Sequence, residues 1–106
     1  MDVVFMLASS GVILMLGTAH LFYTFFGPKL LPRDPSLRAR METAAPVISN
    51  QTTMWRAWIG FNASHSMGAM LFGMLYGHMA WNHAQLLFGS TFLLVLGGTM
   101  LAGYLV

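Results

Sequence analysis

The chain has 106 residues, of which 57% are hydrophobic and only 8% are charged, and its formal net charge is +2. Soluble domains carry about 25% charged residues, so this composition favours a membrane protein. It also argues against a nucleic-acid partner, because the acidic residues Asp34 and Glu42 lie among the few basic ones. Cysteine is absent, which excludes a disulfide framework, a thiolate nucleophile and cysteine metal ligands.

The first predicted element is a transmembrane helix over residues 3–26. At about 1.5 Å per residue, this apolar run is long enough to cross a hydrocarbon core of about 30 Å. Its N-terminal flank contains Asp2 and no Lys or Arg, and the run is longer than a cleavable signal needs. The segment is therefore predicted to be a membrane span rather than a signal peptide.

Residues 27–51 form the one long predicted loop, because they hold all four prolines and most of the charge. Within the loop, Asp34 can cap a short helix that has Pro35 at its first position and stops before Pro46. Such a helix would lie in the membrane interface. All five basic residues fall between positions 29 and 56. The positive-inside rule therefore predicts that this loop is cytoplasmic and contacts lipid headgroups.

Two further spans are predicted, over residues 52–77 and 85–106, with a short turn between them. The turn carries His78, Trp81, Asn82 and His83, which suit the membrane boundary. The predicted fold is thus all-α, a single transmembrane domain of three helices. No polar flank follows the last span, which leaves open a fourth span beyond Val106.

The predicted second span contains an unusual density of polar residues. At 100° per residue, one stripe holds seven residues, with Ser66 at its margin: Trp55, Trp58, Asn62, His65, Ala69, Gly73 and Tyr76. In the first span, a polar stripe holds Ser10, Gly17, His20 and Thr24. Each of these two helices therefore has a histidine on its more polar side.

These residues allow a structural and a functional interpretation. In the first, the polar side chains hydrogen-bond across helices because lipid offers no partner. In the second, they bind a cofactor such as haem or quinone, since an intramembrane histidine is uncommon. The predicted cofactor-binding set is His20, Trp58, Asn62, His65 and Ser66. A paired site at His20 and His65 meets an objection, because counting residues from the cytoplasmic end places them about 10 Å apart along the axis.

Two other patterns lie on the same helix. Gly60, Ser64 and Gly68 form a line of small residues that lets another helix approach closely. Met70 and Met74 form a pair of soft thioether ligands that suit Cu(I), and in that respect the chain is similar to small three-span copper transporters. Chance spacing competes with this reading, because the chain contains ten methionines.

The segments "GTAHLFYTFFGPKLLPRDPSL" and "TTMWRAWIGFNASHS" together resemble a group of small multi-span bacterial membrane proteins. The resemblance covers roughly residues 17–77. It implies a bacterial inner-membrane location, and it implies no chemistry because the group has no established activity.

No catalytic constellation emerges from the sequence, because the predicted spans contain no carboxylate and no serine beside a base and an orienting acid. The leading hypothesis is a non-catalytic accessory subunit that packs against other membrane subunits or against itself. The alternative is a membrane binding protein for haem, quinone or another apolar ligand that uses His65 or His20. Cu(I) transport through Met70 and Met74 is a third reading.

Overall fold

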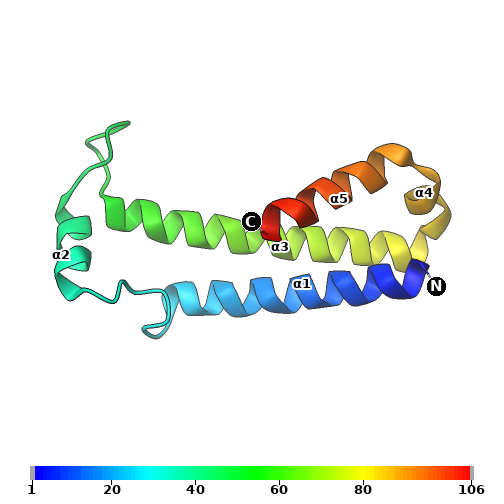
Figure 1. Ribbon diagram of the computed structural model, residues 1–106, viewed down its shortest axis with the longest axis horizontal. Helices are drawn as coiled ribbons and strands as arrows, with labels where there is room; N and C mark the ends of the chain where they lie inside the picture. Colours follow the sequence, from blue (N-terminus) through cyan, green and yellow to red (C-terminus); the bar gives the residue numbers. More distant parts are fainter. Residues whose placement is uncertain (1, 106) are drawn as a thin grey trace.

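The computed structural model describes residues 2–105 and the side chains of residues 2–104. It consists of five helices: α1 (Asp2–Phe25), α2 (Pro35–Thr43), α3 (Met54–Asn82), α4 (Ala84–Gly89) and α5 (Thr91–Leu105) (Figure 1). No strand occurs in this part of the chain, which confirms the all-α prediction.

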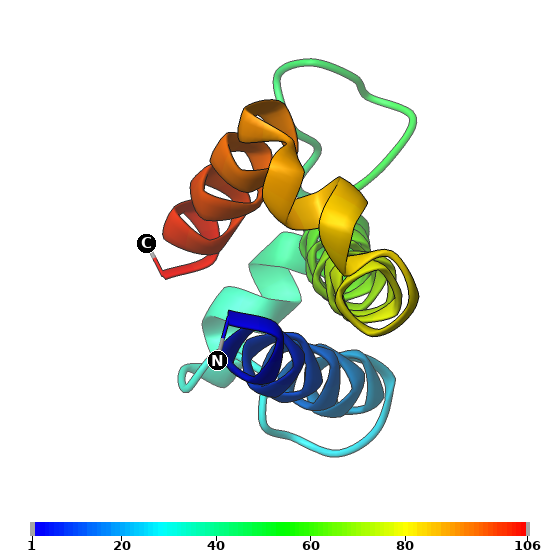
Figure 2. The ribbon, with the colours of Figure 1, turned by 90° about the vertical axis from the view of Figure 1, so that its right-hand side faces the viewer.

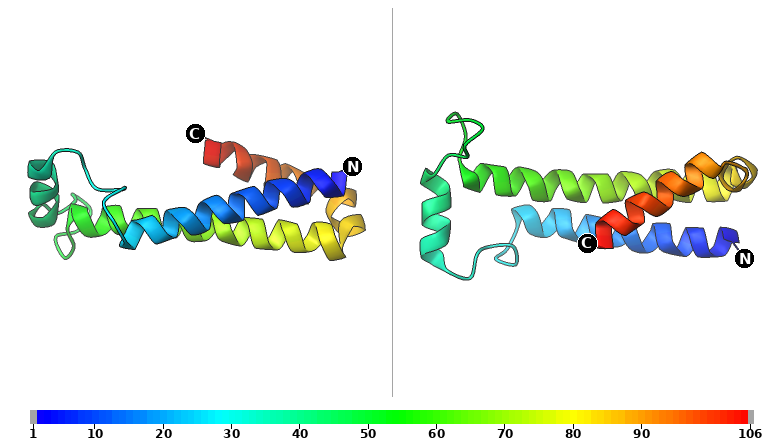
Figure 3. Two further views of the ribbon diagram at one scale, coloured as in Figure 1. Left: turned by 90° about the horizontal axis from the view of Figure 1, so that it is seen from below. Right: turned by 45° about the horizontal axis from the view of Figure 1, so that its top comes forward.

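The long helices α1 and α3 lie side by side and run antiparallel (Figures 1 and 3). At one end, α2 lies across the connection between them, and at the other end α4 turns the chain so that α5 folds back along α3 (Figure 3). The end-on view shows α1 and α5 on two different sides of α3 (Figure 2). The molecule is accordingly elongated, with extents of 51 × 28 × 19 Å.

Helix α2 begins as the sequence predicts. Asp34 is its N-cap, and the Asp34 Oδ1 atom accepts hydrogen bonds from the Ser36 amide at 2.9 Å and from the Ser36 hydroxyl at 2.7 Å. These bonds stabilise the charged carboxylate and hold the pKa of Asp34 below its ordinary value. Pro35 occupies the first turn, and the helix ends at Thr43, before Pro46.

The hairpin of α1 and α3 buries small and polar residues and exposes large apolar ones. In α1, the buried residues are Ser10, Gly17 and Thr24, whereas Phe5 is 63% exposed and Met15 is 64% exposed. A water-soluble helix pair shows the reverse arrangement. Close packing of small residues is the pattern by which helices associate in lipid.

The facing surface of α3 follows a heptad-like spacing. Six of the eight buried residues of α3 recur at alternating intervals of four and three, and the other two are Phe72 and Met79. The six are Asn62, Ser66, Ala69, Gly73, Tyr76 and Ala80. Gly73 allows the closest approach, because a β-carbon there would lie 2.7 Å from the backbone oxygen of Ser10. We call the surface that α1 and α3 bury between them the polar seam.

A small apolar core lies at the end of the hairpin away from α2. It consists of Phe72, Tyr76, Met79, Ala80 and Leu87. The Tyr76 hydroxyl donates a hydrogen bond of 2.7 Å to the backbone oxygen of Leu93, and Gly97 leaves room for the Tyr76 ring. Helix α5 is thereby attached to α3.

Two predicted boundaries are wrong. The predicted turn at residues 78–83 is helical up to Asn82, so α3 has 29 residues. The predicted span over residues 85–106 is interrupted at Ser90, whose hydroxyl accepts a hydrogen bond of 3.2 Å from the Leu93 amide and so starts a new helix. Helix α5 consequently has 15 residues and rises about 22 Å, which is less than a bilayer core of about 30 Å.

Among the described residues, α1 is the one helix that is both long enough and apolar enough to cross a membrane. Residues Thr91–Tyr104 are apolar but shorter. The length and composition of the helices therefore support only the first of the three predicted membrane spans.

Candidate functional site

The polar seam has its densest hydrogen bonding at Asn62. The Asn62 side chain is only 3% exposed, and its Nδ2 atom donates a bond of 2.9 Å to the backbone oxygen of Trp58. Its Oδ1 atom lies 2.9 Å from Nε2 of His20 in α1. Since Oδ1 is an acceptor only, His20 Nε2 carries the proton in this bond.

The rings of His20 and His65 lie close together, with centroids 5.9 Å apart and planes inclined at 56°. The predicted 10 Å offset between these residues is therefore wrong as a measure of ring separation. The reason is the stagger of the two helices. Gly17 packs against Ser66 and Ala69, so His20, three residues further along α1, is level with His65. Helix α3 begins several residues beyond the level at which α1 ends, and counting both helices from one common end does not include this stagger (Figure 1).

His65 lies at the edge of the polar seam and Ser66 at its centre, whereas the sequence prediction placed them the other way round. Ser66 is 1% exposed, and its hydroxyl donates a bond of 2.7 Å to the backbone oxygen of Asn62. His65 is half-buried and has no hydrogen bond within the described part of the chain. The heptad-like spacing explains the exchange, because it selects residue 66 rather than 65 after residue 62.

His65 contacts other helices through its ring. It stacks on Phe61 of its own helix with centroids 5.6 Å apart, and it meets the ring of Tyr104 in α5 edge-on at 4.9 Å. His65 and Tyr104 line a cavity of about 180 Å³ together with Thr99, Met100 and Gly103. Tyr104 is a site residue that sequence reasoning missed, because no local pattern shows that α5 folds back onto this point.

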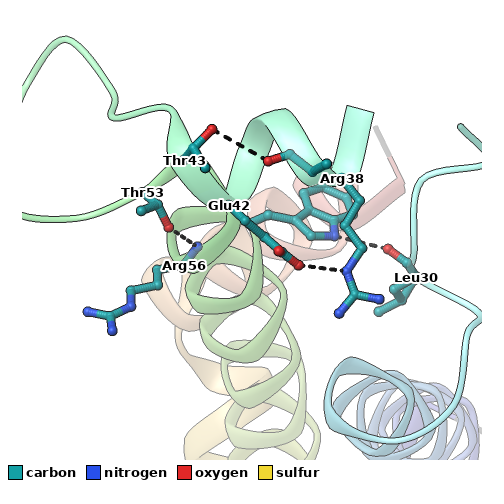
Figure 4. A network of polar contacts seen from close by, with 8 residues as sticks. Leu30, Arg38, Glu42, Thr43, Thr53 and Arg56 are labelled. Atoms are coloured by element: carbon teal, nitrogen blue, oxygen red, sulfur yellow. Dashed lines mark hydrogen bonds and ion pairs between the residues drawn. The ribbon is translucent and has the colours of Figure 1, made fainter. Parts of the chain in front are cut away.

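Trp58 lies apart from the two histidine rings. Its indole Nε1 donates a hydrogen bond of 3.0 Å to the backbone oxygen of Leu30, in the loop that follows α1 (Figure 4). Of the five residues predicted to bind a cofactor, the structure brings together His20, Asn62 and His65. Ser66 joins them through the backbone of Asn62, and Trp58 instead fastens the loop to α3.

Only part of the line of small residues on α3, which consists of Gly60, Ser64 and Gly68, is contacted by another helix. A β-carbon at Gly68 would lie 2.5 Å from the Tyr104 hydroxyl, so Gly68 lets Tyr104 approach. Gly60 has nothing within 4 Å of the corresponding position, and Ser64 is exposed. The predicted close approach of another helix is thus observed at Gly68 alone.

The methionine pair has two different environments. Met70 packs against Gly17 of α1, whereas Met74 is 52% exposed. No group of three or more His, Asp or Glu side chains in the described residues is arranged to hold a metal ion.

No protein-family model, no curated protein and no solved structure matches the chain. Function is therefore inferred from the geometry of the seam and of the helix surfaces.

Proposed function

We propose that the chain is an integral protein of a bacterial inner membrane and serves as a non-catalytic accessory subunit. The observation that carries this proposal is the burial pattern of the α1–α3 hairpin. Ser10, Gly17, Asn62 and Ser66 lie inside, whereas large apolar side chains face outward along both helices. This arrangement is stable where the surroundings are acyl chains or other apolar helices.

In this proposal, α1 and α3 span the bilayer, and α4 with α5 forms a third membrane-embedded segment. The basic connection that contains α2 faces the cytoplasm, as the positive-inside rule predicts. The resemblance to small multi-span bacterial membrane proteins agrees with this topology.

The surface of α5 supports a role within an assembly. Its described contacts with α3 centre on two tyrosines, Tyr76 against Gly97 and Tyr104 against Gly68. Elsewhere α5 exposes apolar side chains, including Phe92 and Val95, and it leaves Gly98 open. Another membrane subunit or a second copy of the chain could pack on this surface by the close approach that small residues permit.

Purification in mild detergent tests the proposal. We expect a colourless protein that co-purifies with itself or with a membrane partner in a fixed ratio. A chain that sediments as a single copy without any partner in several mild detergents would contradict the subunit role.

A second candidate, a membrane binding protein for quinone, is favoured by the surroundings of His65. This ring has no hydrogen-bond partner in the described residues and borders a cavity of about 180 Å³. That volume is below the range of about 300–1,000 Å³ for drug-sized ligands, so it suits a single-ring head group better than haem. A quinone carbonyl would accept a hydrogen bond from His65.

Organic extraction of the purified protein distinguishes the two candidates. Quinone in a fixed ratio, lost in His65→Phe and retained in the control Phe5→Leu on the exposed face of α1, would favour the second candidate. An extract free of quinone would exclude it, and the absence of a Soret band would exclude haem. The third reading, Cu(I) transport through Met70 and Met74, gains no support from their different environments.

A further inference from the structure

A second cavity lies at the loop end of the hairpin. Its volume is about 300 Å³, and it is enclosed by the end of α1, the connection after α1, α2 and the first turns of α3. Its apolar walls include Leu30, Trp55 and Ile59, and its polar lining includes Tyr23 and Arg38. None of its lining residues is a carboxylate, and Arg38 is the one cation among them.

Arg38 is held in a fixed orientation at this cavity. Its guanidinium carbon lies 4.7 Å from the centre of the Trp55 ring. Its Nε donates a bond of 3.0 Å to Glu42 (Figure 4). Within the described residues, this is the one hydrogen bond that the guanidinium makes, which leaves the N–H groups of its terminal nitrogens for a ligand. Both side chains of the ion pair are over 40% exposed, so the pair contributes little to stability and another anion can compete with Glu42 for the guanidinium.

A second cation lies beside the cavity. The Nζ atom of Lys29 is 4.7 Å from the centre of the Tyr23 ring, and Tyr23 lines the cavity. A guanidinium with free N–H groups suits phosphate, because Arg presents paired donors to its oxygens, and the Lys29 ammonium adds a second positive charge next to Tyr23.

The surroundings of the cavity indicate where such a phosphate comes from. Exposed phenylalanines adjoin it at the end of α1, namely Phe22, Phe25 and Phe26. Tyr23 and Trp55 are residue types that settle at the membrane–water boundary. An amphipathic ligand bound here would place its charged group among the cations and its own apolar chains along α1.

We propose that this cavity binds the headgroup phosphate of an anionic phospholipid, with Arg38 as its main donor. The inference rests on the proposed membrane location. A volume of about 300 Å³ is at the lower end of ligand sites, which fits one headgroup. Bound lipid would fix α2 against the membrane surface and hold the basic connection in place.

The test is a lipid titration of the purified protein in mild detergent, followed by native mass spectrometry. Phosphatidylglycerol and phosphatidylcholine with identical acyl chains are compared for the parent protein, Arg38→Gln and the control Arg40→Gln. Arg40 lies on the same helix and is exposed, and it does not line the cavity. The two variants therefore remove the same charge from different places.

We expect the parent protein and Arg40→Gln to prefer phosphatidylglycerol about tenfold, and Arg38→Gln to lose that preference. Equal affinities of the two variants, or equal binding of both lipids by the parent protein, would overturn the proposal. Inorganic phosphate that displaces phosphatidylglycerol at millimolar concentration would show a site for a free anion and would also overturn it.

A second variant guards against misfolding of Arg38→Gln. Ile59→Trp fills the cavity without changing charge, and it should weaken phosphatidylglycerol binding while leaving the helix content measured by circular dichroism unchanged. Unaltered lipid binding would overturn the proposal. Failure of the membrane location would be visible separately, as release of the parent chain from membranes by alkaline carbonate.

Discussion

Replacing Gly73 by alanine should weaken the α1–α3 pairing more than the same change anywhere on the open face of α3. The new β-carbon would lie 2.7 Å from the Ser10 backbone oxygen and 2.9 Å from the Leu14 β-carbon. The first of these distances is about 0.7 Å inside the shortest ordinary contact, 3.4 Å. Because a backbone atom is involved, the helices must move apart, and overpacking of this kind costs about 1–3 kcal/mol.

Gly60→Ala is the matched control, because nothing lies within 4 Å of a β-carbon at that position of the same helix. Both variants gain about 1 kcal/mol of helix propensity, which cancels in the comparison. We expect Gly73→Ala to be less stable than Gly60→Ala by about 1–3 kcal/mol. Unfolding of each protein by sodium dodecyl sulfate in mixed micelles, followed by tryptophan fluorescence, measures the difference. A Gly73→Ala protein as stable as the control would refute the close packing of the seam.

Two further predictions concern hydrogen bonds. Asn62→Leu removes the hydrogen bonds to His20 and to the backbone of Trp58, so it should lower the free energy of unfolding in mixed micelles by about 1–2 kcal/mol. The control Ser64→Leu, on the exposed face of the same helix, should change this free energy little. Equal effects of the two variants would contradict the assigned hydrogen bonds. The carboxylate of Asp34 has a pKa below its ordinary value of 3.8, so it stabilises the start of α2 above that pH, and this contribution is lost as the pH falls through the lowered pKa. The protection factors of the α2 amides, which correct hydrogen exchange for the pH dependence of the intrinsic rate, should therefore fall in acid in the parent protein and be independent of this titration in Asp34→Asn.

The start of α2 was predictable because its signal is local. Asp34 and Pro35 stand next to each other, and a cap acts within one helical turn. Ser90 carries the same kind of signal after Gly89, but the apolar character of the surrounding segment led to the prediction of one continuous span. The capping hydrogen bond at Ser90, rather than the apolar composition of the segment, determines where the helix is interrupted.

The candidate site was only partly predictable because its geometry depends on two helices. Helical periodicity placed Asn62 and His20 on the facing sides of their helices. The stagger between α1 and α3 determines that His20 and His65 meet, and residue counting from a common end does not include it. Tyr104 reaches His65 through the fold of α4 and α5, which the sequence pattern does not show.

The central claim is that the hairpin crosses a membrane with its apolar side chains in lipid and its basic connection in the cytoplasm. Single-cysteine labelling tests this most directly, because the chain has no native cysteine. Three exposed positions suffice: Ala39→Cys in α2, Gln85→Cys in α4 and Leu71→Cys on the outer face of α3. With a membrane-impermeant maleimide, Gln85→Cys should be labelled in intact cells, Ala39→Cys only after permeabilisation, and Leu71→Cys only after the protein is unfolded in detergent. Labelling of Leu71→Cys as readily as the other two would contradict the membrane location, and labelling of Ala39→Cys in intact cells would contradict the orientation.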